Sequence, residues 1–179
     1  MTAHAITIRP AEQRDAQPIA LMSRELIEAG LGWKYDTARV LRAIRDRETL
    51  AAVACEGKGA AARAAIAGFA IMEFGDERAH LVLLAVRPSQ RRLGIGARLF
   101  EWMLHSARTA GMASIHLELR SANEAGRRFY RAMGFYETVL VPGYYRGEGR
   151  KEGALRMLRV LRAPGPVPYT WRPPRTEDT

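Results

Sequence analysis

The sequence predicts one α/β domain built on a mixed central sheet, with elements in the order β-α-α-β-β-β-α-β-α-β-β. Three observations lead to this fold class. A chain of 179 residues with 47% hydrophobic and 26% charged residues has the composition of an ordinary globular domain. Short apolar runs alternate with stretches in which apolar residues recur at helical spacing. A strand, a turn and a helix follow one another near the middle of the chain, as in a parallel crossover.

The first half of the chain is interpreted from its turns and caps. A short strand at residues 6–8 precedes a helix at 15–29, which Gly30 ends. Asp36 or Thr37 caps a second helix. Strands follow at residues 49–55, 64–74 and 79–86, with glycine-containing turns at 57–59 and 75–76 between them.

The second half begins with a long helix from Ile95 that ends before Gly111. The strand at residues 113–119 alternates, and it places His116 and Glu118 on its polar face. Asn123 caps the next helix, which Gly134 closes, and strands at residues 135–141 and 154–161 complete the sheet. Prolines are frequent from residue 163 onward, so we expect a domain at 1–162 and a proline-rich tail at 163–179.

The charge of the chain bears on its partners. A formal net charge of +9 favours an anionic partner. Two arginine clusters flank residues 93–97 and the helix after Asn123, where the phosphates of a nucleotide cofactor would lie, and no nucleic-acid motif accompanies them. No apolar run approaches about 18 residues and no signal peptide is recognisable, so we expect a cytoplasmic protein without membrane contact. The single cysteine, Cys55, is interpreted as a buried hydrophobe.

A glycine loop at residues 91–97 is the strongest functional signal. Gly94 and Gly96 stand at a helix N-terminus, where unpaired backbone N–H groups and the helix dipole attract an anion. A P-loop is excluded, because Ala97 and Arg98 stand where a lysine and a Ser or Thr would be required. A dinucleotide fingerprint is excluded too, because Leu99 occupies the place of its third glycine.

Two motifs resemble one family. The run Arg91-Arg92-Leu93-Gly94-Ile95-Gly96 resembles the acyl-CoA pyrophosphate loop of the GCN5-related N-acetyltransferases (GNAT), written Gln/Arg-x-x-Gly-x-Gly/Ala. Residues 117–135 are similar to the ribosomal-protein alanine N-acetyltransferase branch of that family, which reads Leu-Glu-Val-Arg-x-Ser-Asn, then Leu-Tyr and Gly-Phe. The resemblance spans about residues 6–159. Gly153 departs from it, since an aspartate is common there, and the segment at 33–35 matches only at Trp33.

The resemblance implies the GNAT fold, with a splayed parallel strand pair, acetyl-CoA as co-substrate and no metal. It assigns the pyrophosphate to the backbone of residues 91–97, that is Arg91, Arg92, Leu93, Gly94, Ile95, Gly96 and Ala97. The strand end at Leu84, Ala85 and Val86 would pair with the pantetheine arm and polarise the acetyl carbonyl. Asn123 and Tyr130 would also contact the cofactor, although Asn123 is equally interpreted as a plain helix cap.

The resemblance also assigns the chemistry. Glu118 would be the general base that withdraws the proton of the amine through water, with His116 on the same face as the reserve candidate. Tyr130 would protonate the leaving thiolate. Without the resemblance, Glu118 would be interpreted as a solvated glutamate and Tyr130 as a core aromatic.

The acceptor is predicted from energetics. Neutralising a lysine amine at pH 7 costs about 3 kcal/mol more than neutralising an α-amine, so the leading hypothesis is an N-acetyltransferase for protein or peptide N-termini. An enzyme for a small amine or amino acid is the alternative, and a non-catalytic acyl-CoA sensor is a hypothesis of another class. The acceptor is expected between Trp33 and Tyr35 on one side and Tyr144 and Tyr145 on the other, unless Trp33 is a core plug and the tyrosines cover a sheet edge. The sequence leaves the oligomeric state open.

Overall fold

The computed structural model describes residues 6–57, 65–147 and 151–162. Its elements follow the predicted order, which is confirmed. The seven strands form one sheet in the order β1-β2-β3-β4-β5-β7-β6. The strands are β1 (Ile6–Pro10), β2 (Thr49–Glu56), β3 (Ile66–Phe74), β4 (Arg78–Val86), β5 (Ser114–Arg120), β6 (Tyr136–Arg146) and β7 (Lys151–Val160). The helices are α1 (Ala16–Leu26), α2 (Thr37–Arg45), α3 (Ile95–Thr109) and α4 (Glu124–Ala132), with short 3₁₀ turns η1 (Gln13–Asp15) and η2 (Pro88–Gln90).

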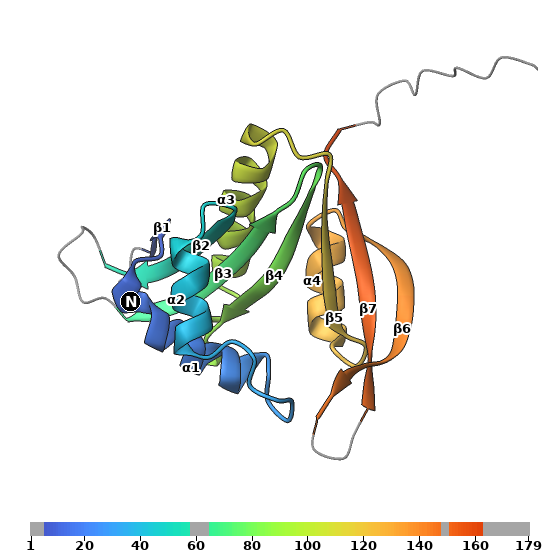
Figure 1. The fold of residues 1–179 in the computed structure, drawn as a ribbon, viewed down its shortest axis with the longest axis horizontal. Helices are drawn as coiled ribbons and strands as arrows, with labels where there is room; N and C mark the ends of the chain where they lie inside the picture. Colours follow the sequence, from blue (N-terminus) through green and yellow to red (C-terminus); the bar gives the residue numbers. More distant parts are fainter. Residues whose placement is uncertain (1–5, 58–64, 148–150, 163–179) are drawn as a thin grey trace, which may run out of the picture.

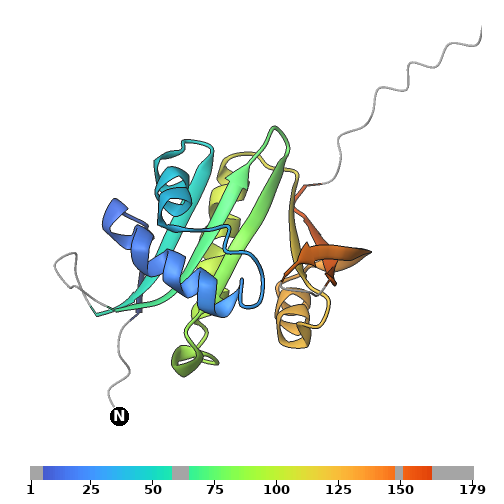
Figure 2. The same cartoon turned by 60° about the horizontal axis from the view of Figure 1, so that its bottom comes forward.

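The helices cover both faces of the sheet. Helices α1 and α2 lie on one face and α3 and α4 on the other (Figures 1 and 2). Two clusters of buried apolar side chains result. One packs α3 against the sheet, with Phe100 and Met103 at its centre, and the other packs α1 and α2 against strands β2 to β4, with Ile19 and Phe69 inside it. Cys55 is buried in the second cluster, which confirms its interpretation as a core residue.

Several element boundaries differ from the prediction, and two of these differences, in α1 and β6, have a clear physical cause. Helix α1 ends at Leu26, three residues before the predicted end, because the N–H groups of Ile27 and Glu28 both return to the Ser23 carbonyl. Strand β6 continues through the Pro-Gly pair at 142–143 to Arg146, although its predicted end was Val141. An irregularity between Val141 and Tyr145 absorbs that pair, which an edge strand tolerates because its outer side needs no hydrogen bonds.

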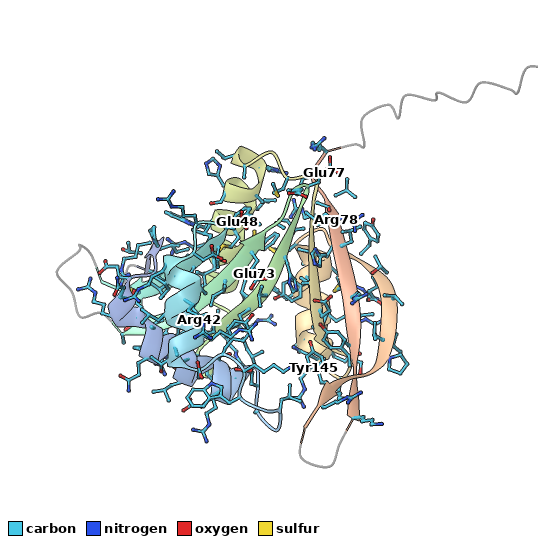
Figure 3. The ribbon with its side chains drawn as sticks, viewed as in Figure 1. Arg42, Glu48, Glu73, Glu77, Arg78 and Tyr145 are labelled. Carbon is cyan, nitrogen blue, oxygen red and sulfur yellow. The ribbon has the colours of Figure 1, made fainter. Side chains whose placement is uncertain are left out.

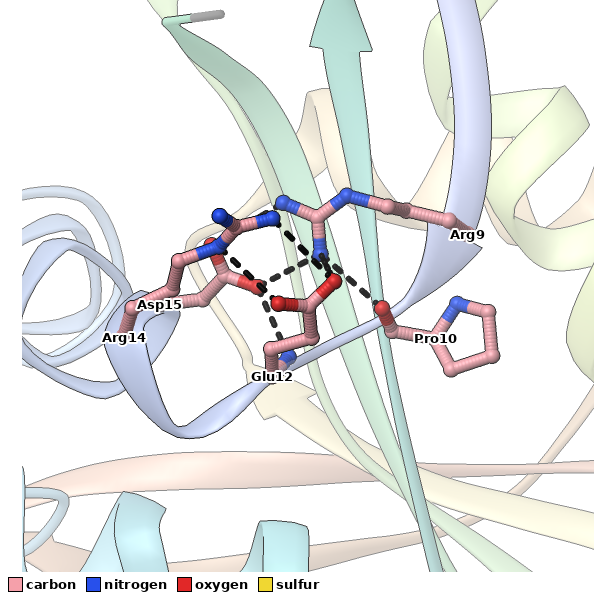
Figure 4. A network of polar contacts seen from close by, with 5 residues as sticks. All are labelled: Arg9, Pro10, Glu12, Arg14 and Asp15. Atoms are coloured by element: carbon pink, nitrogen blue, oxygen red, sulfur yellow. Dashed lines mark hydrogen bonds and ion pairs between the residues drawn. The ribbon is translucent and has the colours of Figure 1, made fainter. Parts of the chain in front are cut away.

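A polar network joins β1 to the start of α1 (Figure 4). Arg9 binds the Asp15 carboxylate through two guanidinium nitrogens, at 2.6 and 3.1 Å, and the Glu12 N–H donates to the same carboxylate at 2.7 Å. Burial would raise the pKa of Asp15, but these hydrogen bonds outweigh it and the pKa lies below its ordinary value. The network fixes where the chain leaves the sheet and enters the helix.

Some predictions fall outside the described residues. The proline-rich tail at 163–179 and the turn residues Lys58 and Gly59 lie there, so the boundary at residue 162 stays a prediction. Among the helices that the structure describes, none has the length and apolar character needed to cross a membrane.

Candidate active site

Strands β4 and β5 are parallel neighbours that separate along their length. They pair only from Arg78 to His80 on β4 and from Ser114 to His116 on β5. Figure 1 shows the two strands diverging from that end. Among the described residues, the edge of β4 that faces β5 has no strand partner beyond His80, and this stretch includes residues 84–86. The Val86 carbonyl at its end accepts from Arg91 Nε at 3.2 Å. A splayed pair was expected from the family resemblance alone, and the fold contains it.

A β-bulge sits in the splayed part of β4. Ile71 pairs with Leu83 and Met72 pairs with Leu81, so Val82 is the extra residue. The bulge switches the faces of the strand, since Leu81 packs in the α3 cluster while Leu83 packs in the α1–α2 cluster. A bulge bends the strand and re-aims its backbone groups, which contributes to the divergence from β5.

The glycine loop ends at the N-terminus of α3. Gly94 has a φ of +74° and Arg92 a φ of +65°, so the chain turns sharply before the helix. Among the described residues, no backbone N–H from 92 to 97 donates to a carbonyl, and Gly94 provides no side-chain cap. Six consecutive donors at the positive end of a 15-residue helix form an anion site.

The two glycines have different roles. A Cβ added to Gly94 would meet no protein atom within 4 Å, so that space is open above the loop. A Cβ on Gly96 would lie 3.4 Å from the Phe129 ring, so this glycine brings α3 close to α4. Two of the nearby arginines already bind backbone carbonyl groups. Arg87 donates to the Ile66 carbonyl, and Arg98 donates to the Ile6 carbonyl.

Asn123 caps α4, with its Oδ1 accepting from the Gly126 N–H at 2.9 Å. The cap prediction is therefore confirmed, and contact of this residue with a cofactor stays a prediction. A Cβ on Gly126 would force the Asn123 amide to shift, so Gly126 makes room for the cap.

Glu118 lies on β5 with only 10% of its side chain exposed, and both of its oxygens are engaged. Oε2 lies 2.8 Å from His80 Nε2, and Oε1 accepts from Arg156 Nε at 3.0 Å. The hydrogen bond from His80 is the main reason that the pKa of Glu118 lies below its ordinary value, against the opposing effect of burial. Glu118 is therefore an ionised, fixed carboxylate.

His116, the reserve candidate, lies beside Glu118 but is poorly suited to accept protons. Its Nδ1 is enclosed without a hydrogen-bond partner, and burial lowers the pKa of its ring. The ring stacks on His80 with centroids 4.5 Å apart and planes 5° apart.

One group of side chains among the described residues could hold a metal ion, and it consists of His80, His116 and Glu118. Their potential ligand atoms lie within 4.8 Å of one another. The arrangement fits a metal poorly. The Arg156 guanidinium on Glu118 would repel a cation, and nearly parallel rings direct their nitrogen lone pairs side by side instead of at one point.

Tyr130 lies on α4, its ring edge-on to those of Phe129 and Phe135. Burial raises the pKa of its phenol well above the ordinary value, and the neighbouring Tyr145 adds to the shift. The phenol therefore stays protonated at neutral pH and is available as a hydrogen-bond donor.

The two expected acceptor segments touch each other. Leu31, in the connector between α1 and α2, forms an antiparallel bridge with Gly147 after β6. Arg120 at the end of β5 donates to the Ala29 carbonyl at 2.7 Å and to Glu152 at 2.6 Å. The connector, β5 and the β6–β7 hairpin therefore meet on one side of the splayed strands.

The aromatic residues predicted to contact the acceptor differ in how far they are exposed. Trp33 and Tyr144 are 40% and 43% exposed, and Tyr145 stands edge-on to Tyr144 at 5.0 Å, at the end of β6 near the connector (Figure 3). The charge of Glu118 helps to raise the pKa of both Tyr144 and Tyr145, after burial, so these phenols lie near the carboxylate. Tyr35 is only 8% exposed and packs in the core, so its contact with an acceptor stays a prediction.

Sequence reasoning missed His80 and Glu28. His80 meets Glu118 only because the parallel register aligns it with His116, 36 positions later in the chain. Glu28 is buried and accepts from Ser23 Oγ and from the N–H groups of Lys34 and Tyr35. A histidine at the polar position of an otherwise apolar strand was the available signal for His80.

Comparison with known proteins identifies the family of the chain. A family model described as the acetyltransferase (GNAT) family matches residues 20–135. The ribosomal protein bS18-alanine N-acetyltransferase of Escherichia coli (strain K12) is 33% identical over 96 residues, which cover 53% of this chain and 65% of that protein. The match therefore spans less than two thirds of that relative's length.

Solved structures share the fold. Ard1 from Thermoplasma volcanium superposes with a TM-score of 0.73 at 25% identity, covering 89% of this chain and 99% of that one. Arabidopsis thaliana NAA60, solved in complex with acetyl-CoA, superposes with a TM-score of 0.77 at 14% identity, covering 88% of this chain and 99% of its own.

Proposed function

Because the chain belongs to the acetyltransferase (GNAT) family, we propose that it transfers the acetyl group of acetyl-CoA to the α-amine of a protein or peptide N-terminus. The observation that carries the proposal is that one fold combines an anion site at the start of α3, which follows β4, with an ionised carboxylate on β5, the strand that separates from β4. The relative named for acetylation of an alanine in ribosomal protein bS18 supports an N-terminal alanine as the first acceptor to test.

Backbone groups of the chain bind the acetyl donor, acetyl-CoA. The unpaired N–H groups of residues 92–97 bind the pyrophosphate, and the open space above Gly94 admits it. The free edge of β4 at residues 84–86 pairs with the pantetheine arm as an added strand would. An N–H on the same edge donates to the acetyl carbonyl oxygen, which stabilises the negative charge that develops there.

Glu118 supplies the base function. Its carboxylate is ionised and fixed by two donors, and each oxygen keeps a further lone pair that a water molecule can use. The proton of the attacking amine leaves through that water toward Glu118. A single water-linked base suits an α-amine better than a lysine amine, whose neutralisation costs about 3 kcal/mol more.

Tyr130 assists the departure of the sulfur. Its phenol is protonated at neutral pH and donates a hydrogen bond to the sulfur as the carbon–sulfur bond breaks. The proton passes to the thiolate, and solvent restores the phenol. The raised pKa of Tyr130 makes it a weaker acid than a free phenol, so its main contribution is the hydrogen bond to the developing charge.

The acceptor lies under the joined connector and β6–β7 hairpin. The exposed ring of Trp33 and the Tyr144–Tyr145 pair offer apolar faces and hydroxyl groups to an extended backbone. Such a surface suits a peptide better than a compact amine. Trp33 Nε1 donates to the Tyr35 carbonyl at 3.1 Å, which helps to hold the indole ring.

The test is an acceptor panel. We expect acetyl-CoA and short peptides with a free N-terminal alanine to give α-N-acetylated product, and lysine-blocked versions to react equally well. Peptides with a blocked N-terminus, free amino acids and polyamines are the comparison set, and mass spectrometry locates the acetyl group. Transfer to amino acids or polyamines with none to peptides would replace this proposal by a small-molecule acetyltransferase.

A further inference from the structure

His80 and Glu118 form a histidine–carboxylate pair across the closed end of the splayed strands. An ionised carboxylate can only accept hydrogen bonds, so the proton in the 2.8 Å contact belongs to His80 Nε2. This contact fixes the tautomer of a neutral His80 and leaves Nδ1 with a free lone pair. The side chain of His80 is 30% exposed, three times as much as that of Glu118 at 10%.

The two stacked histidines differ in what their second nitrogen can do. Among the described residues, His116 Nδ1 is the enclosed side-chain nitrogen without a partner. His80 Nδ1 has no protein partner in that part of the chain either, but it is not enclosed, so water can reach it. His80 is the histidine of the pair that can exchange a proton with a substrate or with solvent.

Two carboxylates lie next to His80. Glu73 stands directly opposite it on β3, and Glu118 binds its Nε2. The stacked His116 stays neutral, because burial lowers its pKa, and so it does not repel an imidazolium. The titratable and charged groups around the pair are Glu73 on β3, Arg78 on β4, His116 on β5, Tyr144 and Tyr145 on β6, and Arg156 on β7.

We propose that His80 is a catalytic residue that accepts the amine proton at Nδ1, with Glu118 as the carboxylate that orients it and stabilises the imidazolium. The inference rests on the proposed acetyl transfer and refines Glu118 from a base acting alone to one half of a pair. An N–H bond of the attacking amine breaks, a water molecule carries the proton, and an N–H bond forms at Nδ1. The imidazolium then returns that proton to solvent.

Glu118 alone would be a weak base, and the pairing with His80 provides a stronger one. The hydrogen bond from His80, with a smaller contribution from Arg156, holds the pKa of Glu118 below its ordinary value, and such a carboxylate is a weak proton acceptor for an amine. An imidazole is ordinarily a stronger base than a carboxylate. The arrangement follows the logic of a catalytic triad, in which the carboxylate keeps its charge while the imidazole carries the proton.

The test compares His80→Gln with the wild type. The amide nitrogen of glutamine can take the place of Nε2 and keep a donor on Glu118, but glutamine does not titrate. We expect kcat/KM for an Ala-starting peptide at pH 7 to fall about 10²-fold, with acetyl-CoA affinity unchanged. We also expect the pH profile of kcat/KM to differ in shape between the two enzymes, because glutamine cannot accept a proton at this position.

His105→Gln is the matched control, because His105 is exposed on α3, away from the pair. His80→Asn replaces His80→Gln if the latter loses acetyl-CoA binding, and it is judged by the same profile. A His80→Gln enzyme with the wild-type rate and the wild-type pH profile would overturn the inference while leaving acetyl transfer intact. A wild-type enzyme that acetylates no peptide N-terminus would instead contradict the proposed function itself.

Discussion

Glu28 binds the connector that carries Trp33. The loss of folding stability on replacing Glu28 can be estimated from the hydrogen bonds that it accepts. The carboxylate accepts from Ser23 Oγ at 3.0 Å, from the Lys34 N–H at 2.8 Å and from the Tyr35 N–H at 3.2 Å. Glu28→Ala leaves all three donors without this acceptor. Ser23 can rotate its hydroxyl and water can reach Lys34, but the Tyr35 N–H is buried.

A buried donor left unpaired costs about 1–3 kcal/mol, and lost hydrogen bonds to a charged group add a similar amount. We therefore expect Glu28→Ala to lower the free energy of unfolding by about 3 kcal/mol, which for a domain of this size lowers Tm by about 6–12 °C. The exposed Glu25 on α1, three residues before Glu28, provides the control, and Glu25→Ala should change the stability by less than about 0.5 kcal/mol.

Urea unfolding followed by circular dichroism measures both variants. Steady-state kinetics with a peptide acceptor should show a raised KM for the peptide in Glu28→Ala, because the connector loses its anchor while the donor site is untouched. A loss of stability below about 1 kcal/mol would refute the claim that this carboxylate organises the connector.

Three further predictions concern the loop, the base and the fold. Gly94→Val places a side chain in the open space above the loop on a backbone with positive φ, so calorimetry should show acetyl-CoA affinity falling at least 10-fold, and unchanged binding by a folded variant would remove the loop from the site. Glu118→Gln should lower kcat by about 10²–10⁴-fold and spare acetyl-CoA binding, with a loss that shrinks at high pH where the amine is already neutral; a pH-independent loss would indicate a structural role. Asp15→Asn should destabilise the protein at pH 7, because the folded pKa of Asp15 is lowered and its ionised carboxylate stabilises the fold. The difference in unfolding free energy between variant and wild type, measured in urea, should diminish below about pH 4, where the wild-type carboxylate becomes protonated. A difference that persists at pH 2 would contradict this.

Local signals in the sequence predicted the elements well. The period-two strand at Glu118, the Asn123 cap and the glycine stop at Gly111 all depend on neighbouring residues, and each is present in the structure. The helix end at Leu26 was missed because it depends on the buried Glu28 carboxylate, which holds the connector beyond the helix.

Long-range pairing was beyond those signals. The contact of His80 with Glu118 requires the register of two parallel strands, which no local pattern specifies. The bridge from Leu31 to Gly147 likewise joins segments that lie more than 100 residues apart in the chain. The splay itself was implied by family resemblance, since neither composition nor periodicity encodes where two neighbouring strands separate.

Direct location of a transferred acetyl group tests the central claim, which is that the anion loop and the Glu118 centre act together on an α-amine. The wild type and Glu118→Gln are each incubated with acetyl-CoA and one peptide that has an N-terminal alanine and an internal lysine, and the product is fragmented by mass spectrometry. We predict an acetyl group on the α-nitrogen with the wild type and almost none with Glu118→Gln, although both proteins bind acetyl-CoA. Acetylation of the lysine side chain, or equal α-acetylation by the two proteins, would contradict the account.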